Sequence, residues 1–389
     1  MSKIAETIKD DISLLDPFMG ASNTLVTGMK CGMNVFGQDI NPLSLLLSQV
    51  KTTFYSAESL LTAEKRILET TEQDKNIDIP IRFPGLNKWF IPSVQIELGK
   101  LHRAISAEKE LKVRKFFWVV LAEVIRLTSN DRTSTFKLHV RPDEEIRSRK
   151  ASALICFKTI SKRNISSITS YISVLENNKL IKSGKYIKSV EVRWADTSES
   201  IKTRKKFNLL VTSPPYGDNQ TTVTYGQFSY LPLQWIPISD IDTAISFDYL
   251  KSTQEIDSQS LGGLKKKDIE EIEEVVFKKS KTLKKFVAQF KDVERLRAQK
   301  VTRFIYDLDR SIDNMLVKLR DNCYMVWTIG NRNVNKTVVP NDVILTELMK
   351  SKGATLFTDL DREILSKRMP GRNNISNTMS KEKILIYKK

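Results

Sequence analysis

The stretch at 212–219, TSPPYGDN, carries the residue types in this sequence that are best suited to chemistry. It follows FNLLV at 207–211, an apolar run typical of a buried strand. Adjacent prolines fix φ and donate no backbone hydrogen bond, so Ser213 and Tyr216 would be held in one conformation. The carboxyl end of a strand is where open α/β sheets bind ligands. A proline pair alone more often marks a rigid turn, so other evidence has to decide between the two interpretations.

A second candidate lies in DPFMGASNT at 16–24, directly after the apolar run that begins at Ile12. A loop after a first parallel strand suits a nucleotide or nucleoside at the start of a helix, and Gly20 would admit close backbone approach. The pattern is weak alone, because Ser22 occupies the second glycine position of GxGxxG and a one-glycine loop is usually a turn.

Two acidic residues end other predicted strands. Asp39 closes 33–40, where a carboxylate can accept hydrogen bonds from both ribose hydroxyls of an adenosine-type cofactor, although a helix-capping role beside Asn41 competes. Asp196 closes 186–196, where it could meet an adenine ring or serve as a surface turn. Three strand ends and the 212–219 segment would converge on one edge of a sheet, which favours a binding site there.

The elements around these residues predict a doubly wound α/β sheet. A strand at 12–18, a short helix, a strand at 33–40 and a helix at 41–54 with Pro42 at its first position form the opening. Further strands are predicted at 207–213 and 323–330, followed by a helix near 340–351 and an antiparallel pair at 354–364 and 383–389. Apolar residues recur at helical spacing on one predicted core face, at Val301, Phe304, Ile305, Leu308, Ile312, Met315, Leu316 and Leu319.

Between these parts the pattern predicts two insertions. From 56 to 185 helices dominate, including 98–129 and a helix at 164–180 with Asn164 as its cap. The sequence therefore divides into a first part of the sheet domain at 1–55, a helical insertion at 56–185, a second part of the sheet domain with the 212–219 motif at 186–235, a basic helical insertion at 236–300 and a last part at 301–389. Either insertion could contact the molecule on which the sheet domain acts.

The chain of 389 residues has a formal net charge of +17 and a pI near 9.5. Such an excess attracts polyanions such as nucleic acid, and a solvated basic surface is an equally weighted alternative. Three distant cysteines and two histidines make a metal site improbable and fit a reducing cytoplasm. No apolar stretch is long enough to span a membrane, and the polar N-terminus does not resemble a secretory signal.

The two motifs together resemble those of the amino-methyltransferases of DNA, whose cofactor motif has the form DPFxGSGT and whose catalytic motif has the form (S/N/D)PP(Y/F). The segments 327–344, 367–376 and 382–389 also resemble the later part of that family's domain. The resemblance implies a Rossmann-like, mostly parallel seven-stranded sheet with an antiparallel last strand. It also implies S-adenosyl-L-methionine as cofactor, double-stranded DNA as substrate and a restriction–modification system with a companion endonuclease.

The resemblance assigns roles to individual positions. Ser213, Pro214, Pro215 and Tyr216 would form the catalytic pocket. Asp39, with Asn41 beside it, would hold the ribose of the cofactor, and Asp196 would lie beside its adenine. The methionine end of the cofactor would be lined by Asp16, Pro17, Phe18, Gly20 and Ser22.

Two departures from the family pattern stand out. Residues 21–23 read Ala-Ser-Asn where the family commonly has Ser-Gly-Thr, which puts a side chain at the closest backbone approach. Only about a dozen residues precede the first strand, so a further cofactor-contacting segment would be missing or supplied by a second chain.

The family chemistry explains why a rigid, polar corner would be useful. The exocyclic amine of cytosine or adenine is a poor nucleophile, and hydrogen bonds to fixed acceptors such as the Ser213 hydroxyl and the Pro214 carbonyl would free its lone pair. Tyr216 would stack on the flipped base. A leading serine favours N4 of cytosine, with N6 of adenine, RNA methylation and a non-catalytic DNA-binding subunit as alternatives.

Overall fold

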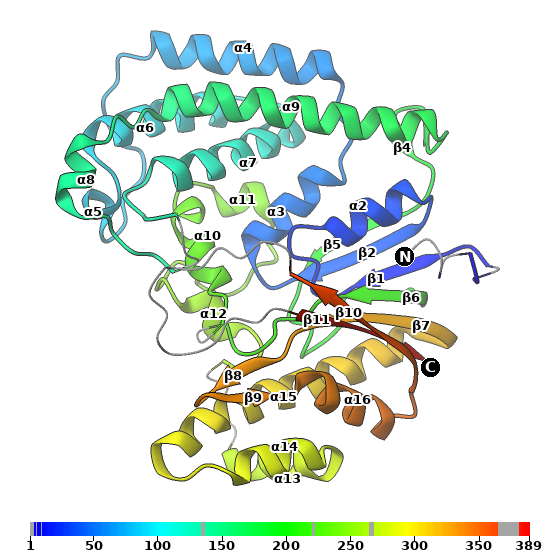
Figure 1. The fold of residues 1–389 in the computed structure, drawn as a ribbon. Helices are drawn as coiled ribbons and strands as arrows, with labels where there is room; N and C mark the ends of the chain where they lie inside the picture. The colour runs from blue at the N-terminus through cyan, green and yellow to red at the C-terminus, as the bar shows by residue number, and fades with distance from the viewer. Residues whose placement is uncertain are drawn as a thin grey trace. The chain divides into compact units, whose positions relative to one another are not determined.

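The computed structural model describes residues 4, 6–8, 10–133, 137–219, 222–263, 268–364 and 381–389. Segment 367–376, part of the predicted family resemblance, therefore lies outside the described residues. The chain forms two compact units (Figure 1). The sheet unit comprises Met1–Asn41, Lys188–Gly226 and Gln254–Lys389, and the helical unit comprises Pro42–Ile187 and Gln227–Thr253.

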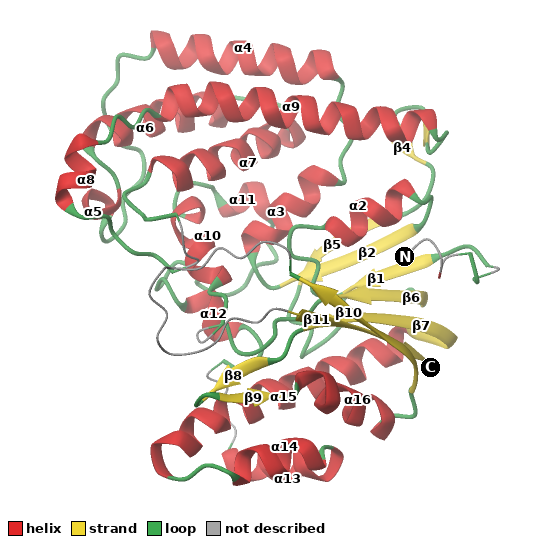
Figure 2. Cartoon of the chain, in the orientation of Figure 1, coloured by secondary structure: helices red, strands yellow, loops and turns green. Residues whose placement is uncertain are grey.

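A seven-stranded sheet runs through the sheet unit in the order β10-β11-β7-β6-β1-β2-β5 (Figure 2). All neighbouring pairs are parallel except those that involve β11, which runs antiparallel to both β7 and β10. The predicted fold class is thereby confirmed. The strands are β1 (Ser13–Asp16), β2 (Asn34–Asp39), β5 (Val190–Trp194), β6 (Phe207–Thr212), β7 (Leu319–Ile329), β10 (Thr355–Glu363) and β11 (Lys381–Lys388).

The strand order reverses at β1, which has β2 on one side and β6 on the other. In register, Leu14 of β1 pairs with Leu209 of β6, so these strands end side by side although they lie far apart in the sequence. Loops that leave the two strands at such a switch point diverge, and ligands of open α/β sheets bind in the resulting crevice.

Side chains of β1 and β2 alternate between the two faces of the sheet, as strand geometry requires. Leu14 and Val35 face α2 (Asn23–Lys30), whose Gly28 lies so close that a Cβ there would be 2.6 Å from Leu14. Leu15 and Phe36 instead join the core on the opposite face. Figure 1 shows α2 on one side of the sheet, with α15 (Asp292–Lys318) and α16 (Asn341–Ser351) on the other.

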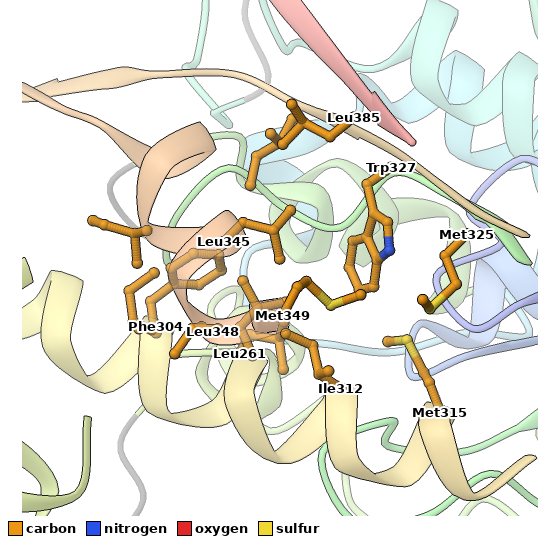
Figure 3. Close-up of a cluster of buried hydrophobic side chains, with 14 of the residues drawn as sticks. Leu261, Phe304, Ile312, Met315, Met325, Trp327, Leu345, Leu348, Met349 and Leu385 are labelled. Atoms are coloured by element: carbon orange, nitrogen blue, oxygen red, sulfur yellow. The ribbon is translucent and has the colours of Figure 1, made fainter. Parts of the chain in front are cut away.

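The core on that second face is built mainly from β7, α15 and α16 (Figure 3). Trp327 and Met325 of β7 lie among Phe304, Ile312 and Met315 of α15, all nearly inaccessible to solvent. The predicted helical core face is confirmed from Val301 to Leu316, which is half-buried, whereas Leu319 is buried as the first residue of β7 and lies outside the helix. The remaining elements of the sheet unit are α12 (Glu255–Gln259), α13 (Ile269–Lys279), α14 (Lys281–Ala288) and the hairpin of β8 (Arg332–Val334) and β9 (Thr337–Val339).

The helical unit is assembled from two stretches of chain. Asp240 of the second stretch accepts hydrogen bonds from Arg114 (2.6 and 2.8 Å) and from the Trp118 indole (2.7 Å) of the first. Its elements are α3 (Pro42–Lys51), α4 (Ala57–Gln73), α5 (Leu86–Trp89), α6 (Pro92–Ser106), α7 (Leu111–Thr128), α8 (Asp143–Ser148), α9 (Ala153–Asn177), β3 (Ile181–Lys182), β4 (Lys185–Tyr186), α11 (Ile238–Ile241) and most of α10 (Tyr225–Leu233).

Some predicted boundaries were wrong. Asn164 caps no helix, because α9 runs through it from the cap residue Ser152, whose side chain accepts from the Ile155 N–H. Glu97 accepts hydrogen bonds from the Ala153 and Leu154 N–H groups and thus satisfies the other free donors of that helix end. The predicted helix at 98–129 is interrupted between α6 and α7, and the predicted strand at 186–196 shortens to β5.

None of the described helices combines the length and apolarity that a bilayer crossing requires. Within the same described residues, no group of three or more histidine, cysteine, aspartate or glutamate side chains is arranged to hold a metal ion. Cys31 is exposed, Cys156 half-buried and Cys323 buried, and all three are free thiols.

Candidate active site

The two sequence motifs meet through one side-chain hydrogen bond at the switch point of the sheet. Thr212, the last residue of β6, donates from its hydroxyl to Oδ1 of Asp16, the last residue of β1, at 2.8 Å. The Phe18 N–H donates to the same oxygen at 3.2 Å. Residues 196 positions apart in the chain are thus held together where a ligand is expected.

Asp16 is only 2% exposed. Burial raises the pKa of its carboxyl to about 6, against the smaller lowering effect of hydrogen bonds from Thr212, Thr24 and the Phe18 backbone. The negative charge of Asp39 raises this pKa a little further. Asp16 therefore titrates close to neutrality, as buried groups of functional sites often do.

Asp39 organises the loop after β1 from the neighbouring strand. Its two carboxylate oxygens accept hydrogen bonds from the Gly20 N–H at 2.9 Å and the Asn41 N–H at 2.8 Å. Burial raises its pKa, and these backbone donors lower it. A carboxylate has about four lone-pair sites, so Asp39 can still accept hydrogen bonds from a diol.

Gly20 has a backbone conformation and surroundings that suit close approach of a ligand. Its φ is +45°, and a Cβ built at this position would meet no atom within 4 Å. The protein thus leaves the space beside this glycine empty, which fits a cofactor pressed against the loop.

The other residues of the cofactor motif are less accessible. Ser22 is completely buried and adopts the left-handed conformation with φ 61°, which explains why a glycine suits this position in the family. Pro17 is also buried, and its carbonyl accepts a hydrogen bond from the Thr197 hydroxyl at 2.6 Å. Phe18 is half-buried and packs against the core cluster.

Asp196 lies in the turn that follows β5. Its Oδ1 accepts hydrogen bonds from the N–H and the hydroxyl of Ser198, both at 2.8 Å, so part of its capacity stabilises that turn. Trp194, which sequence analysis did not single out, donates from its indole to the Ile40 carbonyl at 2.8 Å. This bond fixes the end of β5 against the residue that follows Asp39.

A buried glutamine, which the sequence did not predict to matter, connects β2 by hydrogen bonds to the segment that follows β5. Gln38 of β2 donates to the Thr197 hydroxyl (3.0 Å) and the Ser200 carbonyl (2.9 Å), and accepts from the Lys202 N–H (3.1 Å). The available signal was an amide near the end of the largely apolar strand 33–40, since a buried polar group needs partners.

The catalytic motif forms a corner at the end of β6. Ser213 is exposed, Pro214 is buried and Pro215 is half-buried. The Ser213 hydroxyl lies 3.4 Å from the Tyr216 hydroxyl, which donates to Oε1 of Glu382 at 2.8 Å. The Asn341 side chain donates to the Tyr216 carbonyl at 2.9 Å and fixes the backbone of the corner.

A buried ion pair supports the residues that follow the corner. Nη2 of Arg332 lies 3.2 Å from Oδ2 of Asp218, and these side chains are only 10% and 4% exposed. The guanidinium lies so close to Gly217 that a Cβ there would be 2.4 Å from its Cζ. Arg332 falls in the segment 327–344 that resembles the family, but its partner could not be predicted from that.

Tyr225 links the surroundings of the two motifs. Burial raises the pKa of its hydroxyl, and the negative charges of Asp39 and Glu382 raise it further. Its side chain nevertheless remains 48% exposed. The loop at 16–22 (the cofactor loop), the corner at 213–216 (the catalytic corner) and the start of α10 therefore border one region at the carboxyl edge of the sheet.

The sequence comparisons identify relatives of this chain. The chain is 31% identical over 408 aligned residues to the type II methyltransferase M.MvaI of Kocuria varians, with 99% of this chain and 86% of that protein covered. It is also 39% identical over 69 residues to the type II methyltransferase M.MjaII of Methanocaldococcus jannaschii, which covers 16% of this chain and 12% of that protein. No family model and no solved structure matches the chain.

A nearly full-length relative and the Rossmann-like sheet together define the class of protein. The chain belongs to the family of S-adenosyl-L-methionine-dependent DNA methyltransferases.

Proposed function

We propose that this chain transfers a methyl group to the N4 amine of cytosine in double-stranded DNA, as the modification enzyme of a restriction–modification system. The observation that carries the proposal is the hydrogen bond from Thr212 to Asp16, which holds the catalytic corner beside the cofactor loop. The type II naming of both relatives supports the restriction–modification context.

The catalytic corner suits an exocyclic amine. Ser213 Oγ and the Pro214 carbonyl are acceptors on a backbone that the prolines and Asn341 hold still. Two accepted N–H bonds draw the amine nitrogen toward tetrahedral geometry and localise its lone pair, with little rearrangement during the reaction. The bound cofactor supplies the methyl group on a positively charged sulfur.

The cofactor would lie along the ends of β1, β2 and β5. In this assignment Asp39 accepts from the ribose hydroxyls with Asn41 beside it, and Asp196 lies near the adenine. The methionine end lies along the loop 16–22, where the open side of Gly20 leaves room and the charge of Asp16 attracts a cation. Because Pro17 and Ser22 are buried, we expect these two residues to contact the cofactor through their backbone atoms.

The target base has to leave the duplex before its amine can reach Ser213. We assign to Tyr216 the role of stacking on that base. Its extrusion costs a few kcal/mol, which contacts to phosphates offset. The net charge of +17 supports such contacts, as does an open depression in which four basic side chains surround the single carboxylate of Glu191; the four are Arg193, Lys202, Arg204 and Lys205.

Cytosine is proposed over adenine because serine leads the catalytic motif. The test is to incubate the protein with duplex DNA and cofactor labelled in the methyl group, and then to separate the hydrolysed nucleosides. We expect the label in N4-methylcytosine. Label found only in N6-methyladenine would reject the base assignment, and DNA binding without any transfer would favour the alternative of a non-catalytic subunit.

Gly20 offers a direct test of the cofactor loop. Gly20→Ala should weaken cofactor binding by about tenfold or more, because the new methyl group enters the space left for the ligand. Gly353→Ala is the matched control: it also has positive φ (+85°) and open surroundings, but lies after α16. Both variants carry similar backbone strain, so calorimetric titration that shows equal loss of affinity would contradict the assignment.

We propose that the helices of residues 56–185 recognise the DNA target sequence, with the basic stretch 236–300 as the other candidate. A companion restriction endonuclease is the expected partner in the cell, and a second chain could add a further cofactor contact. DNA from cells that express the protein, sequenced for methylated bases, would give the recognition sequence.

A further inference from the structure

Three oxygen atoms connect the catalytic corner to the last strand of the sheet. The Ser213 hydroxyl lies 3.4 Å from that of Tyr216, which lies 2.8 Å from Oε1 of Glu382. Glu382 belongs to β11 and follows Tyr216 by 166 positions. The roles assigned above use Ser213 and Tyr216 but leave this carboxylate without a function.

The chemistry of the three groups sets the direction of both hydrogen bonds. An ionised carboxylate can only accept, so the Tyr216 hydroxyl donates its single proton to Glu382. The Tyr216 oxygen can then only accept from Ser213. The proton of Ser213 consequently points toward Tyr216, and both lone pairs of Ser213 Oγ are directed away from that proton and can accept from another donor.

We propose that Glu382 is a positioning residue that holds the Ser213 hydroxyl as an acceptor for the amine of the target base. This inference rests on the proposed function, and it holds for cytosine and adenine alike because both present N–H donors. A serine hydroxyl that rotated freely would often direct its own proton at the amine and repel it. The 3.4 Å separation is long for a hydrogen bond, and catalytic hydrogen bonds commonly tighten when substrate is bound.

The position of Glu382 in the sheet suits this role. It pairs in register with Arg362 of β10, whose Nη1 lies 3.6 Å from Oε2, while Oε1 is directed to Tyr216. The side chain is only 17% exposed, so few water molecules compete for it. Because β11 runs antiparallel to β7, its first residues lie at the edge where β7 ends, and β6 ends at that edge too.

The test compares single-turnover methyl transfer by the wild type, Glu382→Gln, Tyr216→Phe and the double variant, on duplex DNA with labelled cofactor. Glutamine keeps the shape of glutamate but can also donate, so the direction of the hydrogen bonds is lost. We expect each single variant to transfer about 10- to 100-fold more slowly. Dissociation constants for DNA and cofactor should change by less than about twofold.

The double variant separates positioning from a merely structural role. If Glu382 acts through the Tyr216 hydroxyl, adding Glu382→Gln to Tyr216→Phe should slow transfer no further. Asp361→Asn is the control, since it removes a carboxylate of the same β10–β11 ladder that pairs with Lys383 at 2.7 Å. It should transfer at the wild-type rate. Full activity of Glu382→Gln, or losses that multiply in the double variant, would overturn the inference.

A second measurement does not depend on activity. In protein labelled with ¹³C at the ζ carbon of tyrosine, the Tyr216 resonance is assigned by its absence from Tyr216→Phe. It should shift in Glu382→Gln and stay in place in Asp361→Asn, and an unmoved resonance in Glu382→Gln would overturn the inference. A wild-type chain that methylates no DNA amine would instead overturn the proposed function, and the positioning role with it.

Discussion

Asp16→Asn is expected to raise the free energy of unfolding of the cofactor-free protein by about 2–3 kcal/mol at pH 7.5. Burial raises the pKa of Asp16 from 3.8 to about 6, so at this pH the folded chain holds a charge that burial disfavours. No ion pair to Asp16 is present among the residues that the structure describes. Asparagine removes the charge and keeps an acceptor for the Thr212 hydroxyl and the Phe18 N–H.

The direction of the pH dependence follows from the raised pKa. The folded chain binds this proton more tightly than the unfolded chain, so the contribution of Asp16 to stability is fully present below about pH 4 and is lost as the pH rises through 6. The advantage of Asp16→Asn should therefore grow between pH 4 and 7 and then level off. Denaturant unfolding at several pH values measures it.

The same substitution should weaken the enzyme. S-adenosyl-L-methionine carries a net positive charge, so loss of the Asp16 carboxylate should lower its affinity by about tenfold at pH 7.5. In the wild type, affinity should fall as the pH drops below about 6 and Asp16 takes up its proton, whereas the variant should lack this dependence. Calorimetric titration across this range tests both statements.

Asp309→Asn is a control for which the free energy of unfolding should change in the opposite direction. Asp309 is as buried as Asp16, but Lys279 and Lys352 lie 2.5 and 2.9 Å from its oxygens. Removing this charge takes away the partner of Lys279 and leaves Lys352 paired with Asp313 alone, and should destabilise the protein by about 1–3 kcal/mol. Equal changes in the two variants would mean that the burial of Asp16 is not what limits stability.

Arg332→Ala is expected to lower the free energy of unfolding by about 3–5 kcal/mol and to abolish most methyl transfer. The change removes the cation next to Asp218, whose side chain is 4% exposed, and empties the space against Gly217. Loss of that support lets the residues after Tyr216 shift, and misplacement of a catalytic group by about 1 Å can cost 100-fold in rate.

Two further variants isolate the cause. Adding Asp218→Asn to Arg332→Ala removes the buried charge that has lost its cation and should recover about half of the lost stability, while the rate stays low because the cavity remains. Lys158→Ala, which breaks an exposed pair with Glu72 at 2.8 Å, should change stability by less than about 1 kcal/mol. A loss of that small size in Arg332→Ala would contradict the prediction.

The sheet could be predicted because it follows from local patterns. Short apolar runs marked β1, β2, β6 and β7, and the polar residues directly after them marked the edge at which a doubly wound sheet binds ligands. The helical spacing from Val301 onward predicted the face of α15 that packs against β7.

The residues that support the site could not be predicted in this way. Glu382, Arg332 and Asn341 reach the catalytic corner from elements more than a hundred positions further along the chain. Each is an ordinary polar residue in its own segment, and only the folded sheet shows which backbone or hydroxyl it meets. Register and strand order, rather than any local motif, give these side chains their partners.

Local composition also did not predict which of the two units each part of the second insertion joins. The basic stretch 236–300 contains residues of both units, since Gln227–Thr253 belongs to the helical unit and Gln254–Lys389 to the sheet unit. Charged helices such as α13 and α14 present apolar positions at helical spacing, and this shows that one face is buried but not what buries it.

The bond network around Asp240 constrains how this chain can evolve. Because Arg114 and Trp118 come from one stretch and Asp240 from another, a gene fragment exchanged with a relative would bring in only half of that network. A mismatched half would bury a charge without its counterpart. Diversification of the helical unit should therefore proceed by point substitution or by paired replacement of both stretches, and rarely by a single recombination event.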